Sequence, residues 1–201
     1  MSFFEQGGLL YGVVYSLWRG SLAARCRLWT EFYRRVVAEC GAGTIFRTNI
    51  YMAYPKRIRI GRNCSFGERV VIYAQDSAGS LTIADGVEIS DGVVLDFTGN
   101  VSIGRNAIIS SGVSIYTHDH GRDPHARPIA CDLTIEENVW IGAGAYVLPH
   151  VQKIGQGAII GAGSIVTAPV PQSVVIAGNP GRVLAQQNGA DRTTMQTWEA
   201  V

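Results

Sequence analysis

Three of the four histidines in the chain, His118, His120 and His125, lie within eight residues of one another. A neutral imidazole accepts a proton near pH 7 and also binds zinc, so such a cluster suits either general-base catalysis or metal binding. The segment that carries them, residues 113–127, interrupts a regular six-residue repeat. Catalytic and binding groups concentrate on loops that a rigid scaffold holds in place, so we expect the chemistry of the protein here.

The scaffold is visible as large apolar residues that recur every six positions from residue 60 onward. They fall into five groups of three: Ile60, Phe66, Ile72; Ile83, Ile89, Leu95; Ile103, Ile109, Ile115; Ile135, Ile141, Val147; and Ile154, Ile160, Val166. Neither the 3.6-residue period of a helix nor the two-residue period of a strand gives this spacing. A chain that turns a corner every six residues does, and three such sides close one coil of a parallel solenoid.

The distance between successive coils locates a large insertion. The coils begin at residues 60, 83, 103, 135 and 154, so their lengths exceed eighteen residues by 5, 2, 14 and 1. The largest excess falls in residues 116–134, which contain the histidine cluster. A coil can extend a loop at one corner without disturbing its strand ladders, so we predict one long protruding loop.

The first 45 residues follow a different pattern. Apolar residues recur at helical spacing over residues 9–18 and again over 28–37, and arginines are interspersed with them. One interpretation is a helical pair that covers the open end of the solenoid. The other is a basic amphipathic helix that makes peripheral contact with a membrane. No apolar run reaches the roughly 18 residues that a spanning helix needs.

Composition narrows the functional classes further. The chain has 201 residues, of which 47% are hydrophobic, and a net charge of +1. This length predicts one domain with an appendage. Because the charge is nearly balanced, the protein has no general attraction to nucleic acid, and we expect no nucleic-acid partner.

The repeat resembles the left-handed parallel β-helix of hexapeptide-repeat acyltransferases, over about residues 57–182. The resemblance implies an all-β fold of about five three-sided coils and assembly as a homotrimer with active sites between subunits. We expect a helical segment at residues 1–45, the β-helix at 46–178 with its loop at 116–134, and a tail at 179–201.

Within that family, the histidine segment looks like the maltose, galactoside and colanic-acid type O-acetyltransferases. These enzymes carry a histidine eight residues after a Gly-Val pair, and here Gly112 and Val113 lead to His120. The resemblance therefore implies that His120 is the general base, with His118 as the alternative. It also implies direct attack of the acceptor on the thioester, without an acyl-enzyme.

Three downstream segments match the acetyl-CoA side of the same family: V-W-I-G-A-G-A-Y-V-L-P-H, I-I-G-A-G-S-I-V-T and A-G-N-P-G-R-V-L. By this resemblance, Trp140 lines the pantetheine groove and the N–H of Ala143 stabilises the oxyanion. Ala162 and Thr167 contact the CoA arm, and Arg182 pairs with the nucleotide phosphates.

The resulting prediction is acetyl-CoA dependent O-acetylation of a sugar hydroxyl in surface-polysaccharide biosynthesis. The acceptor would be a saccharide or a sugar nucleotide, and Asp96 is the candidate contact for its hydroxyl. We expect acetyl-CoA as the co-substrate and no metal. The expected location is the cytoplasm, at the inner face of the membrane.

Three other functions fit parts of the sequence. An amino-sugar N-acetyltransferase is the nearest alternative. A zinc enzyme of the γ-carbonic anhydrase type would use the H-x4-H spacing of His120 and His125, but it also needs an earlier histidine, and none precedes His118. A non-catalytic assembly solenoid would not require the long loop, Trp140 and the A-G-N-P-G-R segment together.

Overall fold

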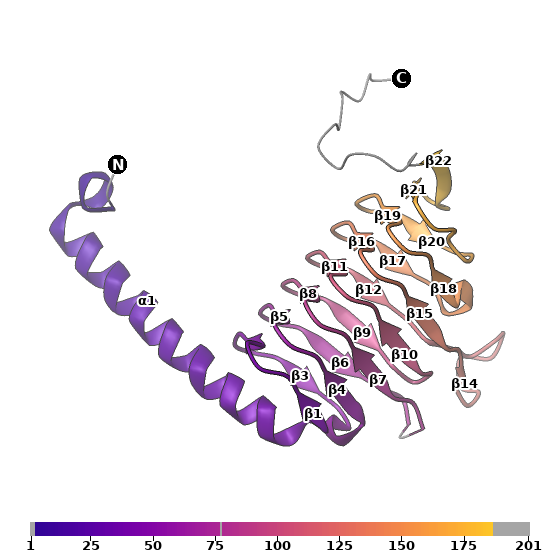
Figure 1. Cartoon of the computed structure of the whole chain (residues 1–201), viewed down its shortest axis with the longest axis horizontal. Coiled ribbons are helices and arrows are strands. Elements are labelled where there is room, and N and C mark those ends of the chain that lie inside the picture. The colour runs from indigo at the N-terminus through magenta and orange to yellow at the C-terminus, as the bar shows by residue number, and fades with distance from the viewer. Residues whose placement is uncertain (1–2, 77, 187–201) are drawn as a thin grey trace.

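A computed structural model describes the backbone of residues 3–76 and 78–186, and their side chains from residue 14 on, apart from residues 16 and 19. One long helix, α1 (Phe3–Val36), precedes a stack of short strands that pair almost entirely in parallel (Figure 1). Three of the sheets form the sides of a triangular solenoid, and a fourth is a two-stranded hairpin. The solenoid is the left-handed parallel β-helix that the family resemblance implies.

Each coil contributes one strand to each sheet. Sheet A contains β1 (Glu39–Cys40), β4 (Ile58–Ile60), β7 (Leu81–Ile83), β10 (Val101–Ile103), β15 (Leu133–Ile135) and β18 (Lys153–Ile154). Sheet B contains β2 (Ile45–Phe46), β5 (Ser65–Phe66), β8 (Glu88–Ile89), β11 (Ile108–Ile109), β16 (Trp140–Ile141), β19 (Ile159–Ile160), β21 (Val174–Ala177) and β22 (Arg182–Gln186). Sheet C contains β3 (Tyr51–Met52), β6 (Val71–Tyr73), β9 (Val94–Asp96), β12 (Ser114–Ile115), β17 (Tyr146–Val147) and β20 (Ile165–Val166).

The predicted apolar ladders form the core of the solenoid. All fifteen residues of the five groups are buried, with at most 4% of their surface exposed. Equivalent residues lie directly above one another, as in the register Leu95–Ile115–Val147. Burial of one such aliphatic side chain contributes about 1.5–3 kcal/mol, so the stacked rows stabilise the solenoid strongly.

The structure adds a coil that the repeat analysis did not include. Strands β1 to β3 form this first coil, so the described residues contain six complete coils rather than five. The solenoid therefore begins at Glu39, and the predicted boundary at residue 46 is too late. Cys40, Phe46 and Met52 occupy the inward positions of this coil at the same six-residue spacing, but only one of them is a residue type typical of the repeat.

The predicted helical pair is wrong, because α1 continues without a break from Phe3 to Val36. The two apolar segments therefore belong to one helix. This stretch contains no proline, and an isolated glycine such as Gly20 costs a helix only about 1 kcal/mol relative to alanine. Glycine at this position consequently weakens the helix without ending it.

The last turns of α1 close the end of the solenoid. Tyr33 and Val37 are buried, and the ring of Tyr33 packs on Phe46, with 5.1 Å between the ring centroids. Phe46 stacks in turn on Phe66 of the next coil at 4.6 Å. Thr30 Oγ1 accepts a hydrogen bond of 3.0 Å from the N–H of Phe46. The capping interpretation is thus confirmed for this end of the helix.

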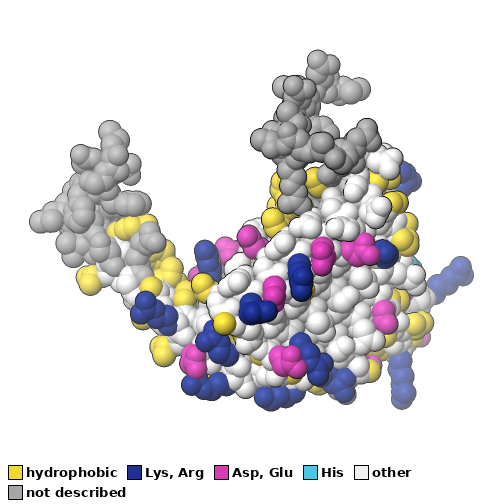
Figure 2. Space-filling model, in the orientation of Figure 1, with side chains coloured by type: hydrophobic (Ala, Val, Ile, Leu, Met, Phe, Trp, Pro, Cys, Tyr) yellow, Lys and Arg dark blue, Asp and Glu magenta, His cyan; other side chains and the backbone are white. Residues whose placement is uncertain are grey.

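The rest of α1 extends beyond the stack (Figure 1) and exposes large apolar side chains (Figure 2). We call this set the α1 stripe, and it consists of Val14, Leu17, Trp18, Leu28, Trp29 and Phe32, each 37–72% exposed. Within the described residues, no helix combines the length and the apolar character needed to cross a membrane.

At the other end of the stack, β22 folds back antiparallel on β21. The predicted tail, residues 179–201, therefore contains a strand at Arg182–Gln186. The remainder of the predicted tail, residues 187–201, lies outside the described residues.

Candidate active site

The three largest insertions predicted from coil length lie at one edge of the prism, where the chain passes from sheet C to sheet A. We call this edge the loop corner; it comprises residues 74–80, 97–100 and 116–132, which follow β6, β9 and β12 in three successive coils. Because the coils stack in register, residues far apart in sequence meet here. The loop corner therefore brings together polar side chains from three coils.

The longest insertion forms a hairpin. Strands β13 (His118–Asp119) and β14 (Ile129–Ala130) pair antiparallel, and the N–H of Cys131 bonds the carbonyl of Thr117 at 2.8 Å to close its base. Asp119 bonds the imidazole of His150 at 2.9 Å, which ties the hairpin to the 3₁₀ turn η2 (Pro149–Val151) of the following coil. The N–H of Gly121 donates to Asp119, and this bond lowers the pKa of the Asp119 carboxyl, with His150 adding to the effect.

His118 is held by a buried carboxylate. Its Nδ1 lies 2.7 Å from Asp96 Oδ2, and the exposed fractions of the two side chains are 10% and 0%. Asp96 Oδ2 also accepts from the N–H of Thr117 at 2.7 Å, and Oδ1 accepts from the N–H and Oγ1 of Thr98. Four donors therefore satisfy the carboxylate, as a buried charge requires.

This environment contradicts the predicted role of Asp96 as a contact for the acceptor. The carboxylate is fully buried and both of its oxygens are already engaged. Sequence position alone could not show this, because the donors come from Thr98 in its own coil and from Thr117 in the next. Asp96 fixes His118 instead.

His120 has a different anchor. Its Nδ1 lies 2.7 Å from the carbonyl oxygen of Ala126, across the turn of the hairpin. The ring is partly exposed, and it meets the ring of His118 edge-on, with 5.1 Å between centroids and an interplanar angle of 90°. The structure thus brings both predicted base candidates to one place, whereas His125 lies on the exposed part of the turn.

The anchors define which nitrogen of each histidine is basic. The carboxylate of Asp96 and the carbonyl of Ala126 are acceptors only, so the Nδ1 atom of each neutral ring carries its hydrogen. The Nε2 atom of each ring then carries the lone pair. His118 Nε2 lies 3.5 Å from the amide nitrogen of Gln75, in the first insertion of the loop corner.

Two tyrosines flank Asp96 in the neighbouring coils. Tyr73 and Tyr116 follow the inward residues Ile72 and Ile115, just as Asp96 follows Leu95. Burial, with Asp96 and Tyr116 contributing, raises the pKa of Tyr73 to about 12, so its phenol stays neutral at physiological pH. Gln75, Thr98 and the two tyrosines were not predicted, and the only signal for them was the excess coil length around residues 74–80 and 97–100.

Three of the residues predicted to bind acetyl-CoA lie on another side of the prism. Trp140 is on β16 of sheet B, 42% exposed, and donates from Nε1 to Ser110 Oγ at 3.0 Å. Ala143 and Ala162 are exposed at the corner between sheets B and C, one coil apart, and the N–H of Gly163 bonds the Ala143 carbonyl.

The other two predicted residues lie near the C-terminal end of the stack. Thr167 follows β20, and Arg182 begins β22; both are exposed. Within one chain, the residues Trp140, Ala143 and Ala162 that are predicted to bind acetyl-CoA, called the acetyl-CoA set below, therefore lie away from the loop corner that holds His118 and His120.

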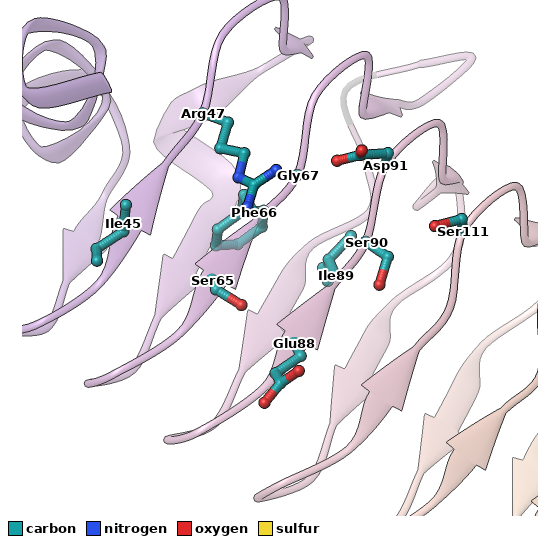
Figure 3. A pocket seen from close by; sticks show the side chains of 10 residues that line it. All are labelled: Ile45, Arg47, Ser65, Phe66, Gly67, Glu88, Ile89, Ser90, Asp91 and Ser111. Carbon is teal, nitrogen blue, oxygen red and sulfur yellow. The ribbon is translucent and has the colours of Figure 1, made fainter. Parts of the chain in front are cut away.

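A groove of about 400 Å³ opens on the outer face of sheet B near α1 (Figure 3). Its lining includes Arg47, Glu88 and Asp91, together with serines and Phe66. Asp91 Oδ1 already accepts from the N–H of Glu68 at 2.7 Å. The groove contains no histidine and is separate from the loop corner. Among the described residues, no group of three His, Cys, Asp or Glu side chains is arranged to hold a metal ion.

Comparison with known proteins places this β-helix among acyltransferases. Residues 132–168 match the family model described as bacterial transferase hexapeptide (six repeats). The galactoside O-acetyltransferase of Escherichia coli is 33% identical over 163 residues, which cover 79% of this chain and 68% of that protein. WbbJ of E. coli, whose name describes an O-acetyl transferase of lipopolysaccharide biosynthesis, is 30% identical over 72% of this chain and 79% of its own. The chain therefore belongs to the hexapeptide-repeat acetyltransferase family.

Solved structures agree on the fold. AntD, an N-acyltransferase from Bacillus cereus in complex with dTDP and 3-hydroxybutyryl-CoA, superposes with a TM-score of 0.69 at 20% identity, over 78% of this chain and 87% of AntD. A hexapeptide-repeat acetyltransferase from Vibrio cholerae gives 0.53 at 25% identity, over 77% and 76% of the two chains.

Proposed function

We propose that this acetyltransferase moves the acetyl group of acetyl-CoA to a hydroxyl of a saccharide or sugar nucleotide, in the assembly of a surface polysaccharide. The observation that carries the proposal is the fixed imidazole of His120, whose Nδ1 is tied to Ala126 and whose Nε2 is the basic atom. The similarity of the whole chain to the galactoside enzyme and to WbbJ supports a sugar hydroxyl as the acceptor. The proposed location is the cytoplasm, at the inner face of the membrane.

In this reaction His120 Nε2 accepts the proton of the acceptor hydroxyl as the oxygen attacks the thioester carbon. The N–H of Ala143 stabilises the oxyanion of the tetrahedral intermediate. The CoA sulfur then leaves and takes the proton back from His120. His120 is preferred over His118 as the base because His118 is almost fully covered and its Nε2 faces the Gln75 amide.

The placement of the two residue sets supports a homotrimer. The loop corner of one subunit and the acetyl-CoA set of a neighbour would form each site together, since one chain holds them at different corners. The outward row of sheet C is mostly apolar and suits a subunit interface: Tyr51, Val71, Val94, Ser114, Tyr146 and Ile165. The outward row of sheet A is polar throughout: Glu39, Arg59, Thr82, Ser102, Thr134 and Lys153.

A mixed-subunit experiment tests this arrangement. His120→Ala removes the base, and Ala162→Trp fills the proposed CoA groove from an exposed position. Each variant alone is expected to be inactive, whereas co-expressed variants should recover part of the activity, because some interfaces then combine two intact sets. A monomeric mass by light scattering, or no recovery in mixed assemblies, would contradict the proposed trimer.

We further propose that the α1 stripe rests on an anionic membrane. Leu17 and Leu28 are eleven positions apart, about three helical turns, so they share one face. The described side chains of α1 include four arginines, Arg25, Arg27, Arg34 and Arg35, and a single acid, Glu31, which pairs with Arg34 and Arg35. Apolar and aromatic side chains beside arginines are typical of helices that lie in the membrane interface.

Vesicle sedimentation tests this contact. The protein should sediment with vesicles that contain phosphatidylglycerol and much less with pure phosphatidylcholine, because the arginines add electrostatic attraction. Leu28→Asp should abolish sedimentation, whereas Ala23→Asp, an equal charge change at another exposed position of α1, should reduce it only slightly. If Leu28→Asp changed the oligomeric mass and the wild type bound no vesicles, the stripe would be a protein contact.

The central experiment measures release of CoA thiol from acetyl-CoA with a panel of sugars, nucleotide sugars and lipid-linked sugars. A saccharide should stimulate release and gain an acetyl ester, detected by mass spectrometry and removed by mild base. Amide formation on an amino sugar alone would favour the N-acetyltransferase alternative. No stimulated release and no acetyl-CoA binding would refute the proposal.

A further inference from the structure

Gln75 lies at the loop corner where an acceptor contact is needed. Its side chain is exposed, yet its amide nitrogen lies 3.5 Å from His118 Nε2. Asp96, which was predicted to make such a contact, is buried behind His118. An amide can donate to and accept from a sugar hydroxyl, so Gln75 has the chemistry that Asp96 cannot offer to solvent.

The insertion that carries Gln75 is fastened at several points. The N–H of Gln75 donates to Thr98 Oγ1 at 2.9 Å, and Arg57 Nη1 donates to the carbonyl of Ala78 at 2.8 Å. Gly79 is buried, and a side chain there would collide with the carbonyl oxygen of Phe97. The residues on both sides of residue 77 are therefore placed by contacts with the scaffold.

These contacts close a ring across three coils. Gln75 bonds Thr98, Thr98 bonds Asp96, Asp96 bonds His118, and His118 approaches the amide of Gln75. A ring of this kind couples the backbone of Gln75 to the imidazole of His118, and it places the side-chain amide of Gln75 beside that imidazole. Side chains locked by such neighbours can bind a substrate group with little loss of conformational entropy.

We propose that Gln75 is an acceptor-binding residue that selects saccharides with a second hydroxyl beside the one that is acetylated. The inference rests on the proposed function. His118 and His120 are in ring contact, so a hydroxyl at His120 Nε2 brings its neighbour on the sugar ring toward the Gln75 amide and His118 Nε2. His118, anchored by Asp96, is then a positioning residue for the acceptor.

The test combines Gln75→Ala with deoxy analogues of the best acceptor from the panel. For the wild type, loss of the neighbouring hydroxyl should lower kcat/KM about 5- to 10-fold, the size of one hydrogen bond. Gln75→Ala should cost the same with the complete sugar, mainly as a higher KM for the acceptor. With the deoxy sugar, Gln75→Ala should cost nothing further, because both changes remove one interaction.

Two controls isolate the effect. The KM for acetyl-CoA should be unchanged in Gln75→Ala, and Ser80→Ala in the same insertion should behave as wild type, since Ser80 Oγ bonds Asn100 on the sheet A side. Additive losses with the deoxy sugar, or an unchanged acceptor KM, would overturn the inference while leaving acetyl transfer intact. If the wild type acetylated no saccharide, the proposed function and this inference would both fail.

Discussion

The corner between sheets B and C is as regular as the loop corner is irregular. In each of the six coils one residue at the B–C corner has a positive φ: Asn49, Arg69, Gly92, Gly112, Gly144 and Gly163, with φ of 55–71°. Backbone bonds repeat with them, such as Gly144 N–H to the Ser111 carbonyl and Gly163 N–H to the Ala143 carbonyl. At the loop corner, by contrast, the length of the connection differs from coil to coil. The backbone of the B–C corner is therefore set by the repeat, whereas the loop corner is built from insertions and carries the two candidate bases, His118 and His120.

The largest expected difference between the two corners is in catalysis. His120→Ala should reduce acetyl transfer about 10²- to 10⁴-fold, the range for loss of a general base. The unfolding midpoint should stay near that of the wild type, because His120 belongs to the hairpin rather than to the core. His125→Ala, on the exposed turn, serves as the control and should retain activity. Full activity in His120→Ala with loss in His118→Ala would reverse the assignment of the base.

Asp96→Asn tests whether the loop corner also supports the fold. An amide would present an N–H toward groups that are already donors, so the free energy of unfolding should fall by about 1.5–3 kcal/mol. Denaturant titration measures this loss, and Thr98→Val should lower stability in the same direction. A stable Asp96→Asn variant with a higher acceptor KM would restore the predicted role of Asp96 as an acceptor contact.

Two glycines with similar backbone angles sharpen the comparison. Gly112 at the B–C corner and Gly121 in the hairpin have φ of 71° and 62°, and a side chain would have space at both. Gly112→Val should destabilise the protein by about 1–2 kcal/mol, the strain of a left-handed L-residue. Gly121→Val should instead reduce activity with the thermal midpoint nearly unchanged. Equal effects on stability would show that the hairpin folds as part of the core.

The smallest expected effect concerns the carboxylate of Asp119, which accepts from the N–H of Gly121 and also bonds His150. The pKa of Asp119 is depressed in the folded protein, so its contribution is present above the usual carboxyl range and is lost as the pH falls through the folded value. Asp119→Asn should therefore lower activity slightly at neutral pH and should remove part of the acid sensitivity of the hairpin. Protease cleavage at the hairpin, followed against pH, measures this; identical profiles for variant and wild type would contradict it.

The sequence predicts the solenoid well, because burial requires a large apolar residue at every sixth position. Ile109 and Ile141 are large and apolar because both positions are buried, whatever loop follows them, so the ladders can be recognised from the sequence. The first coil was missed because Cys40 and Met52 are not typical of the repeat. The break assigned to α1 was wrong because apolar spacing alone does not reveal whether a helix continues.

The candidate site was predictable only in part, because the repeat shows where it is interrupted but not which residues meet there. His118 and His120 were located by the interruption of the repeat, but their anchors were not. Ala126 contributes only a backbone carbonyl, which any residue could supply, and Gln75 reaches His118 across 43 positions of sequence. Such pairs arise from the stacking of coils, and no local pattern marks them. The base assignment and the acetyl-CoA residues remain predictions.

The two ends of the stack determine whether one solenoid can associate end to end with another. A parallel solenoid presents an open row of backbone donors and acceptors at each end, and such an edge can recruit a further strand from another molecule. Here the last turns of α1 cover one end, and β22 lies antiparallel across the last strand of sheet B at the other. The last turns of α1 and strand β22 therefore each prevent further molecules from adding to the stack. A chain that starts at residue 38 should associate end to end, which size-exclusion chromatography would reveal.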